Sequence, residues 1–326
     1  AGDSVALLAI ARSLNMWESW ETNEKMDNWD NVVLWEEGMD GYTPEKAGRV
    51  KFARFSTFGT KEGLPFEVQY LTAADELVFF SNTNWTTFDL STGEYITKLG
   101  QLRRLTISGY GLVDLDPDFK NLKNLESLDI SVNNFEKIPE VLTKENFPKL
   151  HALYLNTCQR GVIYDLSNTT TTHFGGLFEE TDQTREFPRR LLEWDNLDTL
   201  TLSVNYLQGR IPDMKDYAQK YTQADISAAD SLPQALVGTP KVLPNIKRFS
   251  INLNRLTGEL PEWLLHHPAL DWMDPFTLVF TQEGKDASGT LAGFTNEPAN
   301  MNYYYEFYEG YKKDPGTEEE EEETTK

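Results

Sequence analysis

Short side chains that both donate and accept hydrogen bonds recur at alternating positions of this chain, interleaved with apolar residues in seven short segments. Together with a tyrosine and several charged residues they form this set: Arg54, Arg104, Thr106, Ser108, Asp129, Tyr154, Asn156, Thr201, Ser203, Arg248, Ser250 and Asn252. Hydroxyl and amide groups of this size bind a peptide strand or a sugar at low cost in conformational entropy, and a tyrosine ring offers an aromatic platform. This pattern predicts a ligand-binding surface.

The same side chains also have a structural interpretation, because a solvated strand collects serine and threonine for solubility and strand propensity. The two interpretations stay equally open on the sequence alone. The chain has no glycine-rich phosphate loop and no nucleophile elbow. Its four histidines lack the spacing of metal ligands, and we expect His266 and His267 on the outer surface of the last repeat. The acids around Pro117 are interpreted as surface charge, so we expect no catalytic residue, no metal and no cofactor.

The segments that carry the candidate residues belong to an internal repeat, leucine-x-x-leucine-x-leucine-x-x-asparagine. Its copies begin at Val50, Ala74, Leu102, Leu125, Leu150, Leu197 and Ile246, and the first two are the weakest. Each of the last two intervals is close to twice the ordinary repeat length without a second copy of the pattern, so insertions explain them. Cys158 takes the asparagine position of its repeat, where a thiol can donate to the turn, and we expect a structural role for it.

Alternating apolar residues in each copy predict a short strand with one buried face. Stacked copies then form one parallel sheet. A proline recurs about ten residues after the last apolar strand position, as in Pro65, Pro117, Pro212 and Pro261, which indicates an extended outer segment. The fold class expected from this pattern is an α/β solenoid, in which each repeat packs only on its neighbours.

The expected domain organisation follows the repeat boundaries. It comprises an N-terminal cap over 1–49 with a helix capped by Asp3 and a tryptophan-rich segment, repeats over 50–275 with insertions near 159–186 and 213–243, a C-terminal cap over 276–313, and a disordered acidic tail over 314–326. Long insertions are often functional, although sequence divergence explains them equally well.

Charge and cysteine content exclude several classes of partner and fold. Asp and Glu total 52 against 30 Lys and Arg, which gives a formal net charge of -22. A surface of that sign repels phosphate backbones and anionic lipids, so we expect neither nucleic acid nor a membrane face as partner. A single cysteine excludes an internal disulfide, and no apolar run is long enough for a transmembrane segment. The first residues include neither an initiator methionine nor a signal segment, so we expect either a shortened chain or a mature form.

Two stretches resemble the plant-type leucine-rich repeat of polygalacturonase-inhibiting proteins and receptor-kinase ectodomains. They are Asn205-Tyr-Leu207-Gln-Gly209-Arg-Ile211-Pro212 and Asn254-Arg-Leu256-Thr-Gly258-Glu-Leu260-Pro261, which follow the consensus asparagine-x-leucine-x-glycine-x-isoleucine-proline. The resemblance covers about residues 3–275. It implies a right-handed superhelix with a parallel β-sheet on its concave face, a helical N-terminal cap and an irregular C-terminal cap. It also implies that the candidate residues lie on the concave face, the usual binding surface of such solenoids.

Plant caps of this kind are held by cysteine pairs, which this chain lacks. The chain is also similar to cysteine-poor leucine-rich repeat proteins of the Bacteroidetes cell envelope. That resemblance implies a location at the cell surface or in the periplasm, with a lipid-anchored cysteine upstream. We therefore expect a non-catalytic recognition module that binds a protein or a glycan through the concave face and the inserted loops. A structural spacer that presents a neighbouring domain, and an inhibitor of a secreted enzyme, are the alternatives.

Overall fold

The computed structural model divides the chain into two compact units, Ala1–Thr181 and Asp182–Lys326. The residues that it describes are 2–16, 20, 24–57, 64–81, 93–133, 135, 137–158, 186–203, 205, 207–216, 219–229, 232–251, 254–265 and 267. The predicted C-terminal cap, the acidic tail and nearly all of the first insertion lie outside these residues. Within the described residues no helix is long and apolar enough to cross a membrane.

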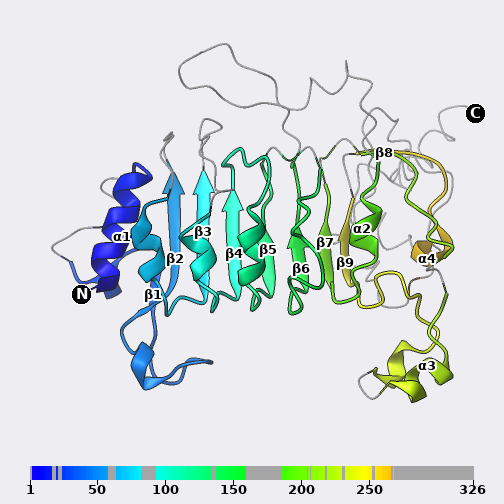
Figure 1. Ribbon diagram of the computed structural model, residues 1–326, viewed down its shortest axis with the longest axis horizontal. Coiled ribbons are helices and arrows are strands. Elements are labelled where there is room, and N and C mark those ends of the chain that lie inside the picture. The colour runs from blue at the N-terminus through cyan, green and yellow to red at the C-terminus, as the bar shows by residue number, and fades with distance from the viewer. Residues whose placement is uncertain are drawn as a thin grey trace, which may run out of the picture. The chain divides into compact units, whose positions relative to one another are not determined.

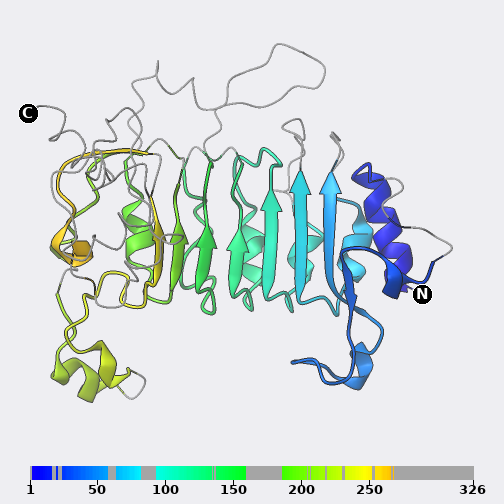
Figure 2. The ribbon, with the colours of Figure 1, turned by 180° about the vertical axis from the view of Figure 1, so that it is seen from behind.

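Each of the seven repeat copies forms a strand (Figures 1 and 2). The first unit holds β2 (Val50–Thr57), β3 (Glu76–Ser81), β4 (Arg104–Ser108), β5 (Ser127–Asp129) and β6 (Ala152–Tyr154), each parallel to the next. The second unit holds the parallel pair β7 (Thr199–Thr201) and β9 (Arg248–Ser250). The two weakest copies of the sequence pattern give the longest strands, of eight and six residues.

The leucine positions of the repeat form the core. In β4 the side chains of Leu105 and Ile107 are buried, while Thr106 between them is partly exposed and Arg104 before them is exposed. Equivalent apolar residues of successive strands stack directly, as in Phe55 and Phe79, whose parallel rings lie 5.0 Å apart. Each such buried side chain contributes about 1.5–3 kcal/mol relative to an exposed one, so the stacked core is the main source of stability.

The repeat asparagine joins neighbouring coils through backbone hydrogen bonds. Fully buried Asn133 donates from Nδ2 to Ile107 O at 2.8 Å and to Ile130 O at 2.7 Å. Its Oδ1 accepts from the N–H groups of Tyr110 at 3.2 Å and Leu112 at 3.3 Å, both in the preceding repeat. One amide thus satisfies four backbone groups that the turn would otherwise bury without partners.

The second unit repeats this arrangement, and one repeat replaces it with a thiol. Asn254 donates from Nδ2 to Leu202 O at 3.0 Å and to Ile251 O at 2.8 Å. Cys158 stands in the same position of its own repeat, and its Sγ lies 3.7 Å from Ile130 O of the preceding one. The structural role expected for Cys158 is therefore what the structure shows.

In the first unit η3 (Phe66–Tyr70), η4 (Ile96–Lys98) and η5 (Pro117–Asn121) lie between the strands from β2 to β5, on one side of the sheet (Figures 1 and 2). In the second unit α2 (Arg189–Leu192) precedes β7, and α4 (Glu262–Leu265) follows β9. The recurring prolines lie at their starts: Pro65 and Pro188 precede η3 and α2, and Pro117 opens η5. Proline suits this position because it lacks the N–H that a first helical turn leaves unpaired. The outer segment predicted as extended therefore ends in one helical turn.

The plant-type stretches form a second, smaller sheet. Strand β8 (Gln208–Gly209) pairs in parallel with β10 (Arg255–Leu256), and Thr257 N–H donates to Gly209 O at 2.8 Å. Gly258 has a φ of +83°, and a Cβ there would lie 2.8 Å from Nε of Arg210. Both conditions favour glycine at this consensus position.

Helix α1 (Gly2–Ser13) covers the start of the first unit and buries Leu7 and Ile10. The Asp3 carboxylate accepts hydrogen bonds from Nε and Nη2 of Arg49 at 3.0 Å each, and from Val50 N–H at 2.8 Å. A bidentate, charge-assisted pair of this kind is among the stronger polar contacts in proteins. Asp3, expected as a helix cap, thus joins the helix to the first repeat.

The cap adds one antiparallel strand and a cluster of aromatic rings. Strand β1 (Val32–Leu34) lies between η1 (Met26–Asn28) and η2 (Pro44–Lys46), and it pairs antiparallel with β2. Trp20 stacks on Trp29 at 5.4 Å and meets Phe55 edge-on at 5.8 Å, which extends the aromatic core of the strands into the cap. The buried Nε1 of Trp35 donates to Ala73 O at 2.8 Å. Tryptophan packing therefore holds the cap to the repeats without a disulfide.

Part of the second insertion forms a closed lobe. Its neck is the antiparallel bridge between Lys220 and Pro240, and Tyr221 N–H donates to Thr239 O at 2.9 Å. The lobe contains α3 (Gln223–Ala228) and η7 (Gln234–Leu236). A capping box, in which Thr222 and Asp225 bond each other's backbone N–H, starts α3.

Candidate functional site

The parallel register of the first unit aligns five outward-facing side chains in one row. They are Arg54 on β2, Val78 on β3, Thr106 on β4, Asp129 on β5 and Tyr154 on β6, each beside the next on its neighbouring strand. Arg54 is exposed, and the other four are partly exposed. We call this set, with Phe80 on β3 and Arg104 on β4, the strand face.

The N-terminal part of the strand face combines a cation with apolar surface. The guanidinium of Arg54 lies over the ring of Phe80, 5.1 Å from its centroid. Val78, the register neighbour of Arg54, adds partly exposed apolar surface beside it. The expected site set omits Val78 and Phe80, although the alternation of the sequence places both at outward strand positions.

Asp129, the fourth residue of the row, has a carboxyl whose charged form is disfavoured by its surroundings. Burial raises the pKa of its carboxyl, and hydrogen bonds from Ser131 oppose that shift. One of these bonds runs from Ser131 N–H to Oδ1 at 2.9 Å. Burial therefore disfavours an unpaired charge on this carboxyl.

Cys158 lies near Asp129 and has an unreactive thiol. Burial raises the pKa of its thiol well above the ordinary value, and the charge of Asp129 adds to the shift. The thiolate is the reactive form of cysteine, so this side chain is not a nucleophile at neutral pH.

A second row of strand-end positions, which contains the predicted site residues Ser108 and Asn156 and also Ser131, is less exposed to solvent. Ser108 and Ser131 are each only 7% exposed. Ser131 Oγ accepts from Asn156 N–H at 3.0 Å, so this hydroxyl serves the turn after β5. Asn156 itself is partly exposed beside it. In this row the structural interpretation of serine has the better support.

The second unit brings its predicted residues together in register but buries most of them. Thr201 pairs with Ser250, and Thr199 pairs with Arg248. Thr201, Ser203 and Ser250 are each 9% exposed, whereas Arg248 is exposed. Asn252 lies outside the described residues. Of the predicted site residues that the structure describes in the second unit, only Arg248 is exposed to solvent.

The lobe of the second insertion presents a small polar cluster at its neck. Nζ of Lys241 lies 5.3 Å from the ring centroid of Tyr221 and 3.5 Å from Oδ2 of Asp225. Hydrogen bonds within the capping box at Thr222 lower the pKa of Asp225, and Lys241 adds to the shift. These contacts stabilise the lobe, and they leave the function of the insertion as a prediction.

His267 departs from its expected place on the outer surface. It is buried, and its Nε2 lies 2.8 Å from Leu243 O. Burial lowers the pKa of the imidazole, against the opposing effect of its backbone hydrogen bonds. Across the described residues, no group of three or more His, Cys, Asp or Glu side chains is arranged to hold a metal ion.

No protein-family model matches the chain, and the curated proteins include no match to it. Similar solved structures include a plant ice-binding protein, at 20% identity over 82% of this chain and 60% of that one, with a TM-score of 0.38. The leucine-rich-repeat ectodomain of the Arabidopsis thaliana receptor kinase GASSHO1/SCHENGEN3, in complex with CASPARIAN STRIP INTEGRITY FACTOR 2, matches at 18% identity over 85% of this chain and 26% of that one, with a TM-score of 0.48. Pollen Receptor Kinase 3 matches at 17% identity over 89% and 91% of the two chains, with a TM-score of 0.41.

This chain therefore spans less than two thirds of the length of the first two structures. At these identities and TM-scores the likeness carries no argument about function. The fold is decided by the strand at each repeat copy, the parallel register and the repeat asparagine that joins adjacent coils. The chain is a leucine-rich-repeat solenoid.

Proposed function

We propose that this leucine-rich-repeat chain is a non-catalytic recognition module that binds an extended segment of a partner protein on the strand face. The observation that carries the proposal is the row from Arg54 to Tyr154, which places a cation, an apolar group, a hydroxyl, a carboxylate and a phenol on five successive strands. Parallel strands lie about 4.8 Å apart, so the row is about 19 Å long and matches about six residues of extended peptide.

The chemistry of the row sets the order of groups in the ligand. Arg54 over Phe80 suits an acidic or aromatic side chain, since the guanidinium pairs with a carboxylate and the ring stacks. Asp129 suits a lysine or arginine, because its carboxyl is held in surroundings that disfavour an unpaired charge. Tyr154 offers a ring at the other end of the row. The ligand is therefore a segment with an acidic or aromatic residue at one end and a basic residue near the other.

The setting of the module is part of the proposal. A net charge of -22 attracts cationic partners and slows encounters with anionic ones, which supports a protein with a basic segment as the ligand. A cap held by tryptophan packing in a chain with one buried cysteine supports the interpretation as a bacterial envelope protein at the cell surface or in the periplasm, with an anchor upstream. The inserted loops, among them the lobe around α3, would then also contribute to recognition.

Selection from a random-peptide display library tests the proposal, with the wild-type protein and a strand-face variant, Arg54→Ser with Tyr154→Ser, as baits. Val113→Ser, at a residue outside the strand face that is 49% exposed, is the matched control. We expect peptides that bind the wild type and the control equally and the strand-face variant at least 10-fold more weakly. Peptides that bind all three proteins equally would place recognition elsewhere, and binding confined to a glycan array would identify a carbohydrate ligand instead.

A further inference from the structure

The second position of every repeat carries an ionisable residue, and the sign of its charge alternates along the chain. In the first unit the series is Lys51, Asp75, Arg103, Glu126 and His151, and in the second unit it is Asp198 and Lys247. Lys51, Asp75, Arg103 and Glu126 alternate strictly in sign, and His151 continues the alternation in its protonated form. We call the five residues of the first unit the charge ladder.

The backbone places successive members of the charge ladder side by side. Asp75 N–H donates to Lys51 O at 2.9 Å, and Arg103 N–H donates to Asp75 O at 2.8 Å. Glu126 N–H then donates to Arg103 O at 2.7 Å, and His151 N–H to Glu126 O at 3.0 Å. The same bond joins Lys247 N–H to Asp198 O in the second unit, at 2.8 Å. Each member therefore lies at the same register, where its strand begins.

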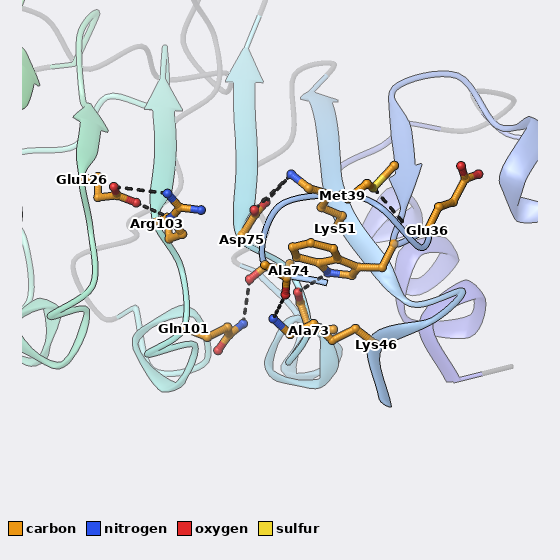
Figure 3. Close-up of polar contacts among 12 residues, drawn as sticks. Glu36, Met39, Lys46, Lys51, Ala73, Ala74, Asp75, Gln101, Arg103 and Glu126 are labelled. Atoms are coloured by element: carbon orange, nitrogen blue, oxygen red, sulfur yellow. Dashed lines mark hydrogen bonds and ion pairs between the residues drawn. The ribbon is translucent and has the colours of Figure 1, made fainter. Parts of the chain in front are cut away.

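The side chains of the charge ladder interact in the same order. Figure 3 shows Lys51 beside Asp75, with Nζ 3.1 Å from Oδ2, and Arg103 in an ion pair with Glu126. The hydrogen bond from Arg103 lowers the pKa of Glu126, and the charge of His151 adds to that shift. The hydrogen bond to Glu126 raises the pKa of Arg103, and the charge of Asp75 adds to that one. Electrostatic contact is thus continuous from Lys51 to His151.

Solenoid repeats share one shape, so a repeat can in principle stack on the wrong neighbour. We propose that the charge ladder specifies the order in which the repeats stack. When one repeat is skipped, the ladder residues two repeats apart come together, and these have like charges. Lys51 would meet Arg103, and Asp75 would meet Glu126. The native order from Lys51 to Glu126 pairs opposite charges at every step, whereas an order that skips a single repeat pairs like charges.

The competing explanation is a set of separate surface ion pairs, each of which contributes little to stability. Separate pairs and the charge ladder predict different results when Arg103 and Glu126 exchange places. The double variant Arg103→Glu, Glu126→Arg restores an isolated pair completely. In the charge ladder it also sets the new carboxylate at position 103 against Asp75, so recovery is incomplete.

The first experiment measures thermal unfolding of the full chain at low salt for Arg103→Glu, Glu126→Arg and the double variant. We expect each single variant to lower Tm by about 2 °C, the order set by surface ion pairs in a chain of this size. The double variant should recover less than half of the summed loss, and all differences should shrink at 1 M salt. Full recovery in the double variant would overturn the proposal.

The second experiment removes one whole repeat, residues 103–125, so that Asp75 becomes the neighbour of Glu126. In this deletion chain we expect Glu126→Arg to raise Tm, because it replaces a like-charge contact with an opposite one. In the full chain the same substitution lowers Tm. Glu140→Arg, at an exposed glutamate outside the charge ladder, is the control and should have the same sign in both chains.

An effect of Glu126→Arg with the same sign in both chains would overturn the proposal. If the deletion chain does not fold without Glu126→Arg but folds with it, the proposal is supported in its strongest form. If neither deletion chain folds, the incomplete recovery expected in the full-length double variant decides the question alone.

Discussion

Asn133→Ala is the substitution whose cost follows most directly from the structure. The amide of Asn133 is fully buried. It accepts from Tyr110 N–H and Leu112 N–H and donates to Ile107 O and Ile130 O, with Ser131 O as a more distant acceptor at 3.2 Å. Each lost donation to a carbonyl costs about 1 kcal/mol, and each buried N–H left without an acceptor costs about 1–3 kcal/mol. For two donations and two N–H groups the expected loss is about 4–8 kcal/mol, a large part of the 5–15 kcal/mol typical of a folded domain.

The assay combines urea unfolding, followed by tryptophan fluorescence, with amide hydrogen exchange. Asn121→Ala, at an exposed asparagine that ends η5, is the matched control and should change stability by less than about 0.5 kcal/mol. Asn133→Cys should cost less than Asn133→Ala, because the thiol of Cys158 already contacts a carbonyl from this position. Exchange at the Tyr110 and Leu112 amides should accelerate in Asn133→Ala. A loss below about 1 kcal/mol with unchanged exchange at both amides would show that the Asn133 side chain does not hold the adjacent repeats together.

Three further substitutions test separate parts of the fold. Trp35→Phe removes the buried bond to Ala73 O and should lower stability by about 1–2 kcal/mol in urea unfolding; an unchanged midpoint would show that this bond does not hold the cap. Val132→Gly should raise stability by about 0.5 kcal/mol, since Val132 has a φ of 61° and Gly109 adopts that conformation in the preceding repeat; a loss would mean that side-chain packing outweighs the strain. Burial lowers the pKa of His267, so its contribution to the free energy of unfolding is present above the ordinary histidine pKa and is lost as the pH falls below it. His267→Gln should therefore flatten the acid side of a plot of Tm against pH. An unchanged acid side would show that burial of His267 does not set the acid sensitivity.

Repeat spacing predicted most of this fold, because each repeat is a local unit that packs only on its neighbours. The starts at Val50 and Ala74 looked weakest because phenylalanine and alanine replace leucine, yet both segments form strands since the buried positions need only apolar side chains. Strand β1 was not predicted, because three residues between turns carry no periodic signal. The role of Asp3 was also missed, since its partner Arg49 is distant in the sequence.

The candidate site could be predicted only in part. Alternation identified which residues face outward, and the register of Arg54, Thr106, Asp129 and Tyr154 follows from it. Alternation does not report how much of an outward residue is exposed, which is why Thr201 was expected to be solvated and is nearly buried. Exposure depends on packing from outside the repeat, which the repeat pattern does not encode.

We expect the strand face of the first unit to bind a peptide with an acidic or aromatic residue at one end and a basic residue near the other. The most direct measurement is the affinity of the strongest peptide from the display selection for the wild type and for Asp129→Asn, by isothermal titration at pH 7. Asp129→Asn keeps the side-chain shape and removes the charge, so we expect it to bind the peptide at least 10-fold more weakly than the wild type does. When the basic residue of the peptide is replaced by glutamine, the two proteins should bind it with equal affinity. Equal affinity of both proteins for the unmodified peptide would show that Asp129 does not recognise the basic residue.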